Sequence, residues 1–309
     1  MTVVKNQNLC DLVGFQKHEI TMKLSYGKFI LDEFIYGGHL AALSVTAIAL
    51  SAIMLLNIMI KWEFLLIVYL LTLCVYSYNY HKELEIDSLN NLSRSNHLKK
   101  YYKFFPLILI IYITAFLAVL LYFGNVESLI FGGLLLSAGL LYTYKFKKLT
   151  RKIIGFKNYY TSFSISSLAI FTSIYYCTQI INWVLLLIFM LLFLRLMINT
   201  SFCDIKDMNA DKKDNLLTFP IVIGKEKLIT LLHLLNIISI IPIFIGVYMN
   251  LLPLFSLFLL VTTVYSSYYL LKTKNKTTNI QSISTALVDG EFILWPFLLF
   301  LGKSVMTMI

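Results

Sequence analysis

The sequence predicts an all-α fold, a polytopic membrane helical bundle with nine transmembrane helices. Hydrophobic residues make up 59% of the 309 residues and charged residues only 14%, a balance far from that of soluble domains. Apolar stretches long enough to cross a bilayer recur from one end of the chain to the other. Backbone groups inside the hydrocarbon have no water to bond, so each stretch is expected to be helical.

Nine stretches have the length and apolar character of a transmembrane helix. No other segment is long enough to form a separate soluble domain. We therefore expect one nine-helix membrane domain over 34–309, preceded by a cytoplasmic N-terminal segment over 1–33. The predicted spans are 34–57, 62–80, 104–123, 127–144, 160–178, 183–202, 228–249, 251–271 and 286–302.

The connections between the predicted spans alternate in charge. Four are longer and rich in lysine and arginine, at 81–103, 145–159, 203–227 and 272–285, whereas the others are short and contain only Lys61. Because basic connections stay on the cytoplasmic side of a membrane, the pattern predicts a multi-pass protein with a cytoplasmic N-terminus and an external C-terminus. The same pattern accounts for the net charge of +10 without nucleic-acid binding.

Cysteine and histidine do not indicate a metal centre or a disulfide framework. The four cysteines form no CxxC pair, and the five histidines show no ligand spacing. The chemistry of the chain must therefore be sought among its 16 acidic residues.

Aspartate is concentrated in CDIKDMNADKKDN, at 203–215, directly after the sixth predicted span. Asp207 and Asp211 are four residues apart, so on a helix their carboxylates lie on one face. Like charges at that spacing repel unless a cation binds between them, and Mg²⁺ takes one or two carboxylates together with waters and substrate phosphates. Asp204 lies on the same face and is a further candidate metal ligand, whereas Asp214 is expected to be a solvated loop acid.

A second oxygen-rich cluster favours metal binding over the alternative, a solvated helix end whose acids are balanced by nearby lysines. Asn79, Glu83 and Asp87 recur at i, i+4 and i+8 where the second span reaches the cytoplasm. Two facing clusters would hold more than one Mg²⁺ with a bridging diphosphate, and basic loop residues would add anion contacts. Metal-assisted departure of an allylic diphosphate would leave a carbocation, which a water-poor, aromatic-lined cavity shelters.

These motifs resemble those of the UbiA-type intramembrane prenyltransferase superfamily, which are NxxxDxxxD after the second helix and DxxxD after the sixth. Here they read Asn79-xxx-Glu83-xxx-Asp87 and Asp207-xxx-Asp211. The resemblance covers roughly 34–302 and extends to smaller elements of the family pattern. These are found at Asn90, Arg94, Tyr142, Lys147, Lys148, Lys157, Asn158, Thr218, Pro220 and Gly224.

The resemblance implies a bundle around a central cavity that is capped on the cytoplasmic side. Members bind a prenyl diphosphate through Mg²⁺ and transfer the prenyl group to an aromatic ring or another lipophilic acceptor. The implied catalytic acids are Asp87, Asp207 and Asp211. The implied Mg²⁺–diphosphate ligands are Asn79, Glu83, Asp87, Asp207 and Asp211, and the implied diphosphate contacts are Arg94, Lys147 and Lys148.

The chain departs from the family pattern at four positions. Asp is common where Tyr80 and Glu83 stand, Pro where Leu92 stands, and Gly where Asn215 stands. These changes indicate a divergent branch and leave the acceptor open. A membrane terpene cyclase, which needs no acceptor, is the alternative enzyme. A transporter or assembly factor, with the acids as an ion pathway, is the non-enzymatic alternative, although transporter sites are expected near the midplane rather than at the rim.

Arg195 stands apart from these motifs because it lies inside the sixth predicted span, where a charge is a functional candidate. We expect it either to contact the diphosphate or to pair with an acid. The candidate acids are Asp289 and Glu291, at the start of the ninth span.

Overall fold

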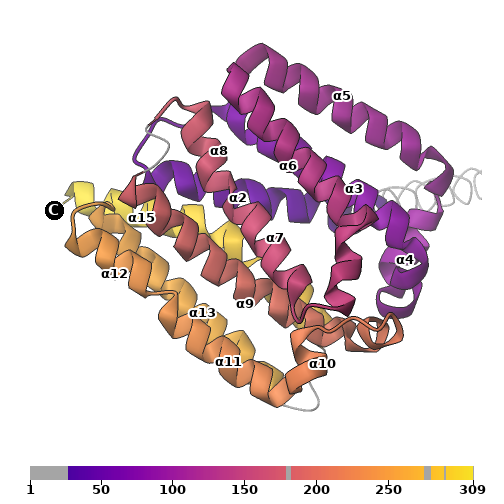
Figure 1. Cartoon of the computed structure of the whole chain (residues 1–309). Coiled ribbons are helices and arrows are strands. Elements are labelled where there is room, and N and C mark those ends of the chain that lie inside the picture. The colour runs from indigo at the N-terminus through magenta and orange to yellow at the C-terminus, as the bar shows by residue number, and fades with distance from the viewer. Residues whose placement is uncertain (1–26, 179–181, 275–279, 289, 309) are drawn as a thin grey trace, which may run out of the picture.

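The computed structural model of the chain describes residues 27–178, 182–274, 280–288 and 290–308, and every regular element within them is a helix (Figure 1). This confirms the all-α class. The elements are α2 (His39–Leu55), α3 (Trp62–Asn90), α4 (Leu92–Lys99), η1 (Tyr102–Phe104), α5 (Phe105–Phe123), α6 (Val126–Tyr144), η2 (Phe146–Arg151), α7 (Phe156–Ser166), α8 (Leu168–Tyr175), α9 (Trp183–Lys213), α10 (Phe219–Ile223), α11 (Lys225–Ile238), α12 (Ile241–Tyr248), η3 (Leu254–Leu259), α13 (Leu260–Thr273), α14 (Ile280–Ile283), η4 (Ser284–Val288) and α15 (Glu291–Met308).

Seven helical stretches in the described part of the chain are long and apolar enough to cross a membrane. An eighth span results if the helix Gly27–Tyr36 and α2 are counted together, and the two meet at a bend of 56°. The bend falls at Gly38, whose φ of 98° is a left-handed conformation that favours glycine. The first predicted span is therefore kinked rather than continuous.

The predicted span 160–178 corresponds to two helices rather than one. α7 has 11 residues and α8 has 8, and they are separated at Ser167. Each is shorter than a single membrane crossing requires. The structure therefore confirms a multi-pass membrane bundle, whereas the number of nine spans stays a prediction.

Two long helices carry the acidic motifs. α3 has 29 residues and α9 has 31, and at a rise of about 1.5 Å per residue both exceed the hydrocarbon thickness of roughly 30 Å. The sequence patterns 62–80 and 183–202 mark only the apolar parts of these helices. The motifs follow as further turns of the same helices, so the spacings of four residues do place side chains along one face.

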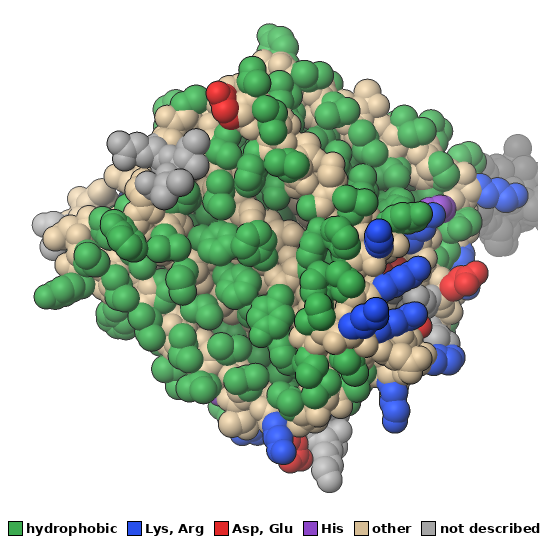
Figure 2. Space-filling model, in the orientation of Figure 1, with side chains coloured by type: hydrophobic (Ala, Val, Ile, Leu, Met, Phe, Trp, Pro, Cys, Tyr) green, Lys and Arg blue, Asp and Glu red, His purple; other side chains and the backbone are tan. Residues whose placement is uncertain are grey.

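The surface of the bundle is mostly apolar. Figure 2 shows hydrophobic side chains over most of one face and Lys and Arg gathered toward one end. α5 and α6 are the most lipid-accessible spans, with only 17% and 11% of their most apolar stretches buried inside the protein. This distribution is typical of a protein surrounded by lipid, because lipid tails contact exposed Leu, Ile and Phe side chains without a free-energy penalty.

A buried ionic cluster joins four helices in the interior. The guanidinium of Arg195 on α9 forms an ion pair with Glu291 on α15, and both side chains are 2% exposed. Asn236 on α11 accepts a hydrogen bond from the same guanidinium. On α13, the carbonyl of Thr262 accepts from Arg195 Nη2 at 3.1 Å. The pairing with Glu291 that the sequence suggested is confirmed, and Asp289 lies outside the described residues.

Candidate active site

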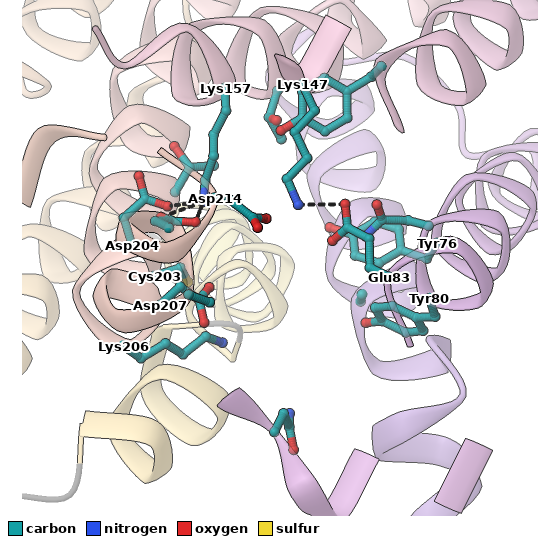
Figure 3. Close-up of a pocket in the computed structure, with 18 of the residues that line it drawn as sticks. Tyr76, Tyr80, Glu83, Lys147, Lys157, Cys203, Asp204, Lys206, Asp207 and Asp214 are labelled. Carbon is teal, nitrogen blue, oxygen red and sulfur yellow. Dashed lines mark hydrogen bonds and ion pairs between the residues drawn. The ribbon is translucent and has the colours of Figure 1, made fainter. Parts of the chain in front are cut away.

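The two acidic motifs meet at one cavity of about 270 Å³ (Figure 3). The last turns of α3 and α9 face each other across it, and the end of α6 and the start of α7 close a third side. The charged and amide side chains among its lining residues are Asn79, Glu83, Asn91, Arg94, Lys147, Lys157, Asn199, Asp204, Lys206, Asp207, Asp211 and Asp214.

The α3 side of the cavity carries the first motif. Lys147, just beyond the end of α6, places its Nζ 2.6 Å from Glu83 Oε1. Thr143 Oγ1 donates to Asn79 Oδ1 at 3.1 Å, which orients the amide. Asp87 belongs to the same helix one turn further on, but its side chain lies outside the described residues. Since both members of the Glu83–Lys147 pair are partly exposed, the contact contributes little to stability and remains available for exchange with a ligand.

The α9 side carries the second motif, and one lysine bridges its acids. Lys157 Nζ lies 2.8 Å from Asp204 Oδ1 and 3.0 Å from Asp211 Oδ2. Asn158 Nδ2 donates to Asp204 Oδ2 at 2.9 Å. Burial by itself would lower the pKa of the Lys157 ammonium, but the carboxylates of Asp204 and Asp211 outweigh burial and raise that pKa well above its usual value. Lys157 is therefore a permanent cation at the cavity wall.

Asp207 differs from its two neighbours on α9. It is half-buried and lines the cavity, and Figure 3 places it on the side of α9 that faces α3. Asp204 and Asp211 are buried and engaged by Lys157. All three aspartates spaced along α9 line the same cavity.

The structure brings most of the predicted site residues together. Asn79, Glu83, Arg94, Lys147, Asp204, Asp207 and Asp211 all line the cavity. The other two candidates that the structure describes lie away from the cavity. Lys148 is exposed on η2, and Arg195 is buried in the cluster with Glu291. Asp214, expected to be a solvated loop acid, is half-buried and lines the cavity as well.

Lys157 and Asn158 match elements of the family pattern, but sequence reasoning assigned them no role in the site. Their only signal in the sequence is the Lys-Asn pair ahead of the fifth predicted span, where the family pattern has the same two residues. Their role depends on α7 packing along α9, which brings together positions 46 to 54 residues apart.

Two departures from the family pattern have a physical explanation. Tyr80, where Asp is common, lines the cavity and stacks against Arg94, whose guanidinium lies 4.4 Å from the ring centroid. Asn215, where Gly is usual, has a φ of 55°. That left-handed conformation is one that asparagine adopts more readily than other residues with a side chain.

Gly155 fixes the start of α7 and hence the position of Lys157. Its φ is 66°, and a Cβ at this position would lie 2.4 Å from the ring of Phe219. We expect Gly155→Ala to destabilise the protein by about 1–2 kcal/mol in thermal unfolding of detergent-solubilised protein, because it adds left-handed strain and a clash. Gly133→Ala is the matched control, since its Cβ would meet nothing within 4 Å. Equal melting temperatures for the two variants would contradict this role.

Two apolar cavities adjoin the polar one. The first, of about 210 Å³, shares Tyr76, Asn79, Tyr142 and Thr161 with the polar cavity. The second, of about 80 Å³, adjoins the first at Val75, Gly139, Ser164 and Ile165. The combined space therefore runs from a charged end, past tyrosine rings, to an aliphatic end between α3, α6 and α7.

The donor set suits a hard cation held jointly with an anionic ligand. In the described part of the chain, no three His, Cys, Asp or Glu side chains converge on one metal-sized position. Lys147 pairs with Glu83, and Lys157 pairs with Asp204 and Asp211. Mg²⁺ does not need such a cage, since it takes one or two carboxylates and completes its shell with waters and phosphate oxygens. The acids on both walls fit that requirement.

The fold and the site together define an intramembrane helical protein with paired acidic motifs at one end of its bundle. The sequence model of the UbiA prenyltransferase family matches residues 45–295, and the chain belongs to this family. Among curated proteins, none matches the chain.

Solved structures of UbiA homologues share the fold. The homologue from Aeropyrum pernix K1 superimposes with a TM-score of 0.66 at 13% identity, over 86% of this chain and 98% of its own. The homologue from Archaeoglobus fulgidus, bound to GPP and Mg²⁺, gives 0.63 at 15% identity, over 88% and 99%. A digeranylgeranylglyceryl phosphate synthase gives 0.55 at 17% identity, over 90% and 98%.

Proposed function

We propose that the chain is a Mg²⁺-dependent intramembrane prenyltransferase. It would ionise a prenyl diphosphate and transfer the prenyl group to a lipophilic acceptor such as an aromatic ring. The observation that carries this proposal is the pair of acidic clusters that face each other across one cavity and open into an aromatic and aliphatic space. The Archaeoglobus fulgidus homologue, which has the same fold, binds GPP and Mg²⁺, and this supports the choice of ligand class.

Each group of residues has a distinct role in this proposal. Asn79, Glu83, Asp87, Asp207 and Asp211 would hold Mg²⁺, which when bound neutralises charge on the departing diphosphate. Arg94, Lys147 and Lys157 would supply cationic contacts to the diphosphate oxygens. Tyr76 and Tyr142 lie at the junction with the apolar cavity, where their rings would face the developing carbocation and exclude water.

We further propose that the cavity opens to the cytoplasmic side and that the N-terminus is cytoplasmic. The support is the alternation of basic connections along the chain, because three of the four basic connections contribute residues to the cavity. A site at the ends of α3, α6 and α9 also argues against the transporter alternative, whose site would lie near mid-membrane.

The apolar space predicts a size-dependent substrate preference. Ser164 lines both apolar cavities, so Ser164→Phe would fill the space proposed for the distal part of a long prenyl chain. We expect turnover of geranylgeranyl diphosphate to fall about tenfold and that of dimethylallyl diphosphate to change much less. Ser164→Ala, which removes the hydroxyl without adding bulk, is the control. An equal loss with both substrates for Ser164→Phe would contradict this placement of the chain.

The proposal is tested by incubating the chain in nanodiscs with Mg²⁺ and prenyl diphosphates of increasing length. Diphosphate release and product masses are measured with and without a membrane lipid extract as the acceptor source. Transfer that depends on the extract supports a prenyltransferase. A terpene formed without it would identify a cyclase instead. If no diphosphate is released from any substrate, and Asp207→Asn binds each one as the wild type does, the enzymatic account is wrong.

A further inference from the structure

The segment 145–155, which joins α6 to α7, reaches the cavity only through Lys147, and its other side carries an unusual surface. It reads KFKKLTRKIIG, with five basic residues and no acidic one. It follows Tyr144, the last residue of a candidate membrane span and itself 68% exposed. Exposed tyrosines at the end of a lipid-facing helix mark the level of the headgroups. The segment therefore leaves the bilayer at its interface, on the lipid-facing side of the bundle.

The geometry of η2 sorts these side chains into three rows. In a 3₁₀-helix, side chains at i and i+3 eclipse, so residues three apart point in the same direction. One row is Lys145, Lys148 and Arg151, and a second begins with Phe146 and Leu149. The third row contains Lys147, which pairs with Glu83, and Thr150, which is fully buried. One edge thus faces the protein and the basic edge faces outward. On the apolar edge, Leu149 is exposed, whereas Phe146 is half-buried beside the ring of Tyr160.

The outward rows are accessible in the described structure. Lys145, Lys148, Arg151 and Lys152 are exposed. Leu149, Ile153 and Ile154 are 37%, 50% and 46% exposed. Figure 2 shows the Lys and Arg side chains gathered over the end of α6 and the start of α7, next to hydrophobic side chains. At the membrane interface, lipid headgroups would contact the basic side chains, and the acyl chains beneath them would contact the apolar side chains.

Hydrogen bonds hold this edge in place. Leu217 donates its N–H to the carbonyl of Thr150 at 2.8 Å and accepts from the N–H of Gly155 at 2.9 Å. Arg151 Nε donates to the carbonyl of Asp214 at 3.0 Å. The backbone of the segment is therefore fastened to the connection that follows α9. Lys212 and Lys213, at the end of α9, are exposed and add positive charge next to that connection.

We propose that segment 145–155 is a docking surface for anionic phospholipid headgroups of the adjacent leaflet. Lys148, Arg151 and Lys152 pair with headgroup phosphates, while Ile153 and Ile154 extend into the acyl boundary. Each Lys or Arg near an anionic membrane surface strengthens association about fivefold. This inference concerns a surface of the fold and does not depend on the proposed reaction.

The test measures lipid binding to the purified full chain by native mass spectrometry. Phosphatidylglycerol and phosphatidylcholine are titrated separately. We expect the wild type to bind phosphatidylglycerol more tightly than phosphatidylcholine. In K148Q/R151Q/K152Q the affinity for phosphatidylglycerol should fall at least about tenfold, and the affinity for phosphatidylcholine should not change. The matched control K227Q/K272Q/K274Q removes the same charge from exposed positions on α11 and at the end of α13, and it should behave as the wild type.

The outcomes separate a docking surface from a general charge effect. Equal loss in the two triple variants, or undiminished phosphatidylglycerol retention in K148Q/R151Q/K152Q, would overturn the proposal. If that variant does not fold, the charge-conserving K148R/K152R and the apolar-edge variant I153S/I154S are used instead. The proposal requires K148R/K152R to bind phosphatidylglycerol as the wild type does and I153S/I154S to lose that binding.

Discussion

Asp207→Asn should lower prenyl diphosphate turnover by at least about a hundredfold with little change in stability. The reason is its position, since Asp207 lines the cavity on the side of α9 that faces the first motif on α3. Asparagine keeps the size of the side chain but removes the charge that attracts a divalent cation. The measurement is the rate of diphosphate release from geranyl diphosphate at saturating Mg²⁺, together with thermal unfolding.

The control for charge removal is Glu226→Gln, an exposed acid in the first turn of α11 that lies outside the cavity lining. It should turn over at the wild-type rate. A rate for Asp207→Asn within a factor of two of wild type would show that this carboxylate takes no part in the chemistry.

Arg195→Leu should destabilise the bundle by about 3–5 kcal/mol, because it leaves the Glu291 carboxylate buried without its cation. Tyr269 OH and Ser266 Oγ each donate to Glu291 Oε2 at 3.0 Å, but neutral donors do not replace a charge. Unfolding of the solubilised protein, followed by circular dichroism in a detergent titration, gives the change in free energy.

The double variant R195L/E291L tests the pairing itself. It removes both charges together and should recover most of the stability lost in Arg195→Leu. The sequence also suggested that Arg195 contacts the diphosphate. Wild-type stability of Arg195→Leu combined with a loss of diphosphate binding would favour that role over the structural one.

The two motifs could be predicted from the sequence because helical periodicity is local. Once 79–87 and 204–211 are helical, spacings of three and four residues place their oxygens along one face regardless of tertiary structure. The membrane class could be predicted for a similar reason, since spanning length and apolar composition are properties of single segments. The facing of the two clusters at one cavity confirms what the pairing of the motifs suggested.

The contacts between distant segments could not be predicted in this way. Nothing in the composition of 156–166 shows that α7 packs along α9 and brings Lys157 between two aspartates. The partner of Arg195 could not be predicted either, because its sequence position allowed a contact with the substrate or an ion pair with Glu291. The bend at Gly38 and the break at Ser167 depend on backbone conformations that a hydropathy pattern does not contain.

The most direct test of the central claim is equilibrium binding of a non-ionising prenyl diphosphate analogue, geranyl S-thiolodiphosphate, by titration calorimetry with the solubilised chain. If the facing acids form one Mg²⁺–diphosphate site, the wild type binds the analogue at a single site only when Mg²⁺ is present, and Asp207→Asn abolishes that binding. Unchanged affinity in the presence of a chelator, or wild-type affinity in both Asp207→Asn and Glu83→Gln, would contradict the account.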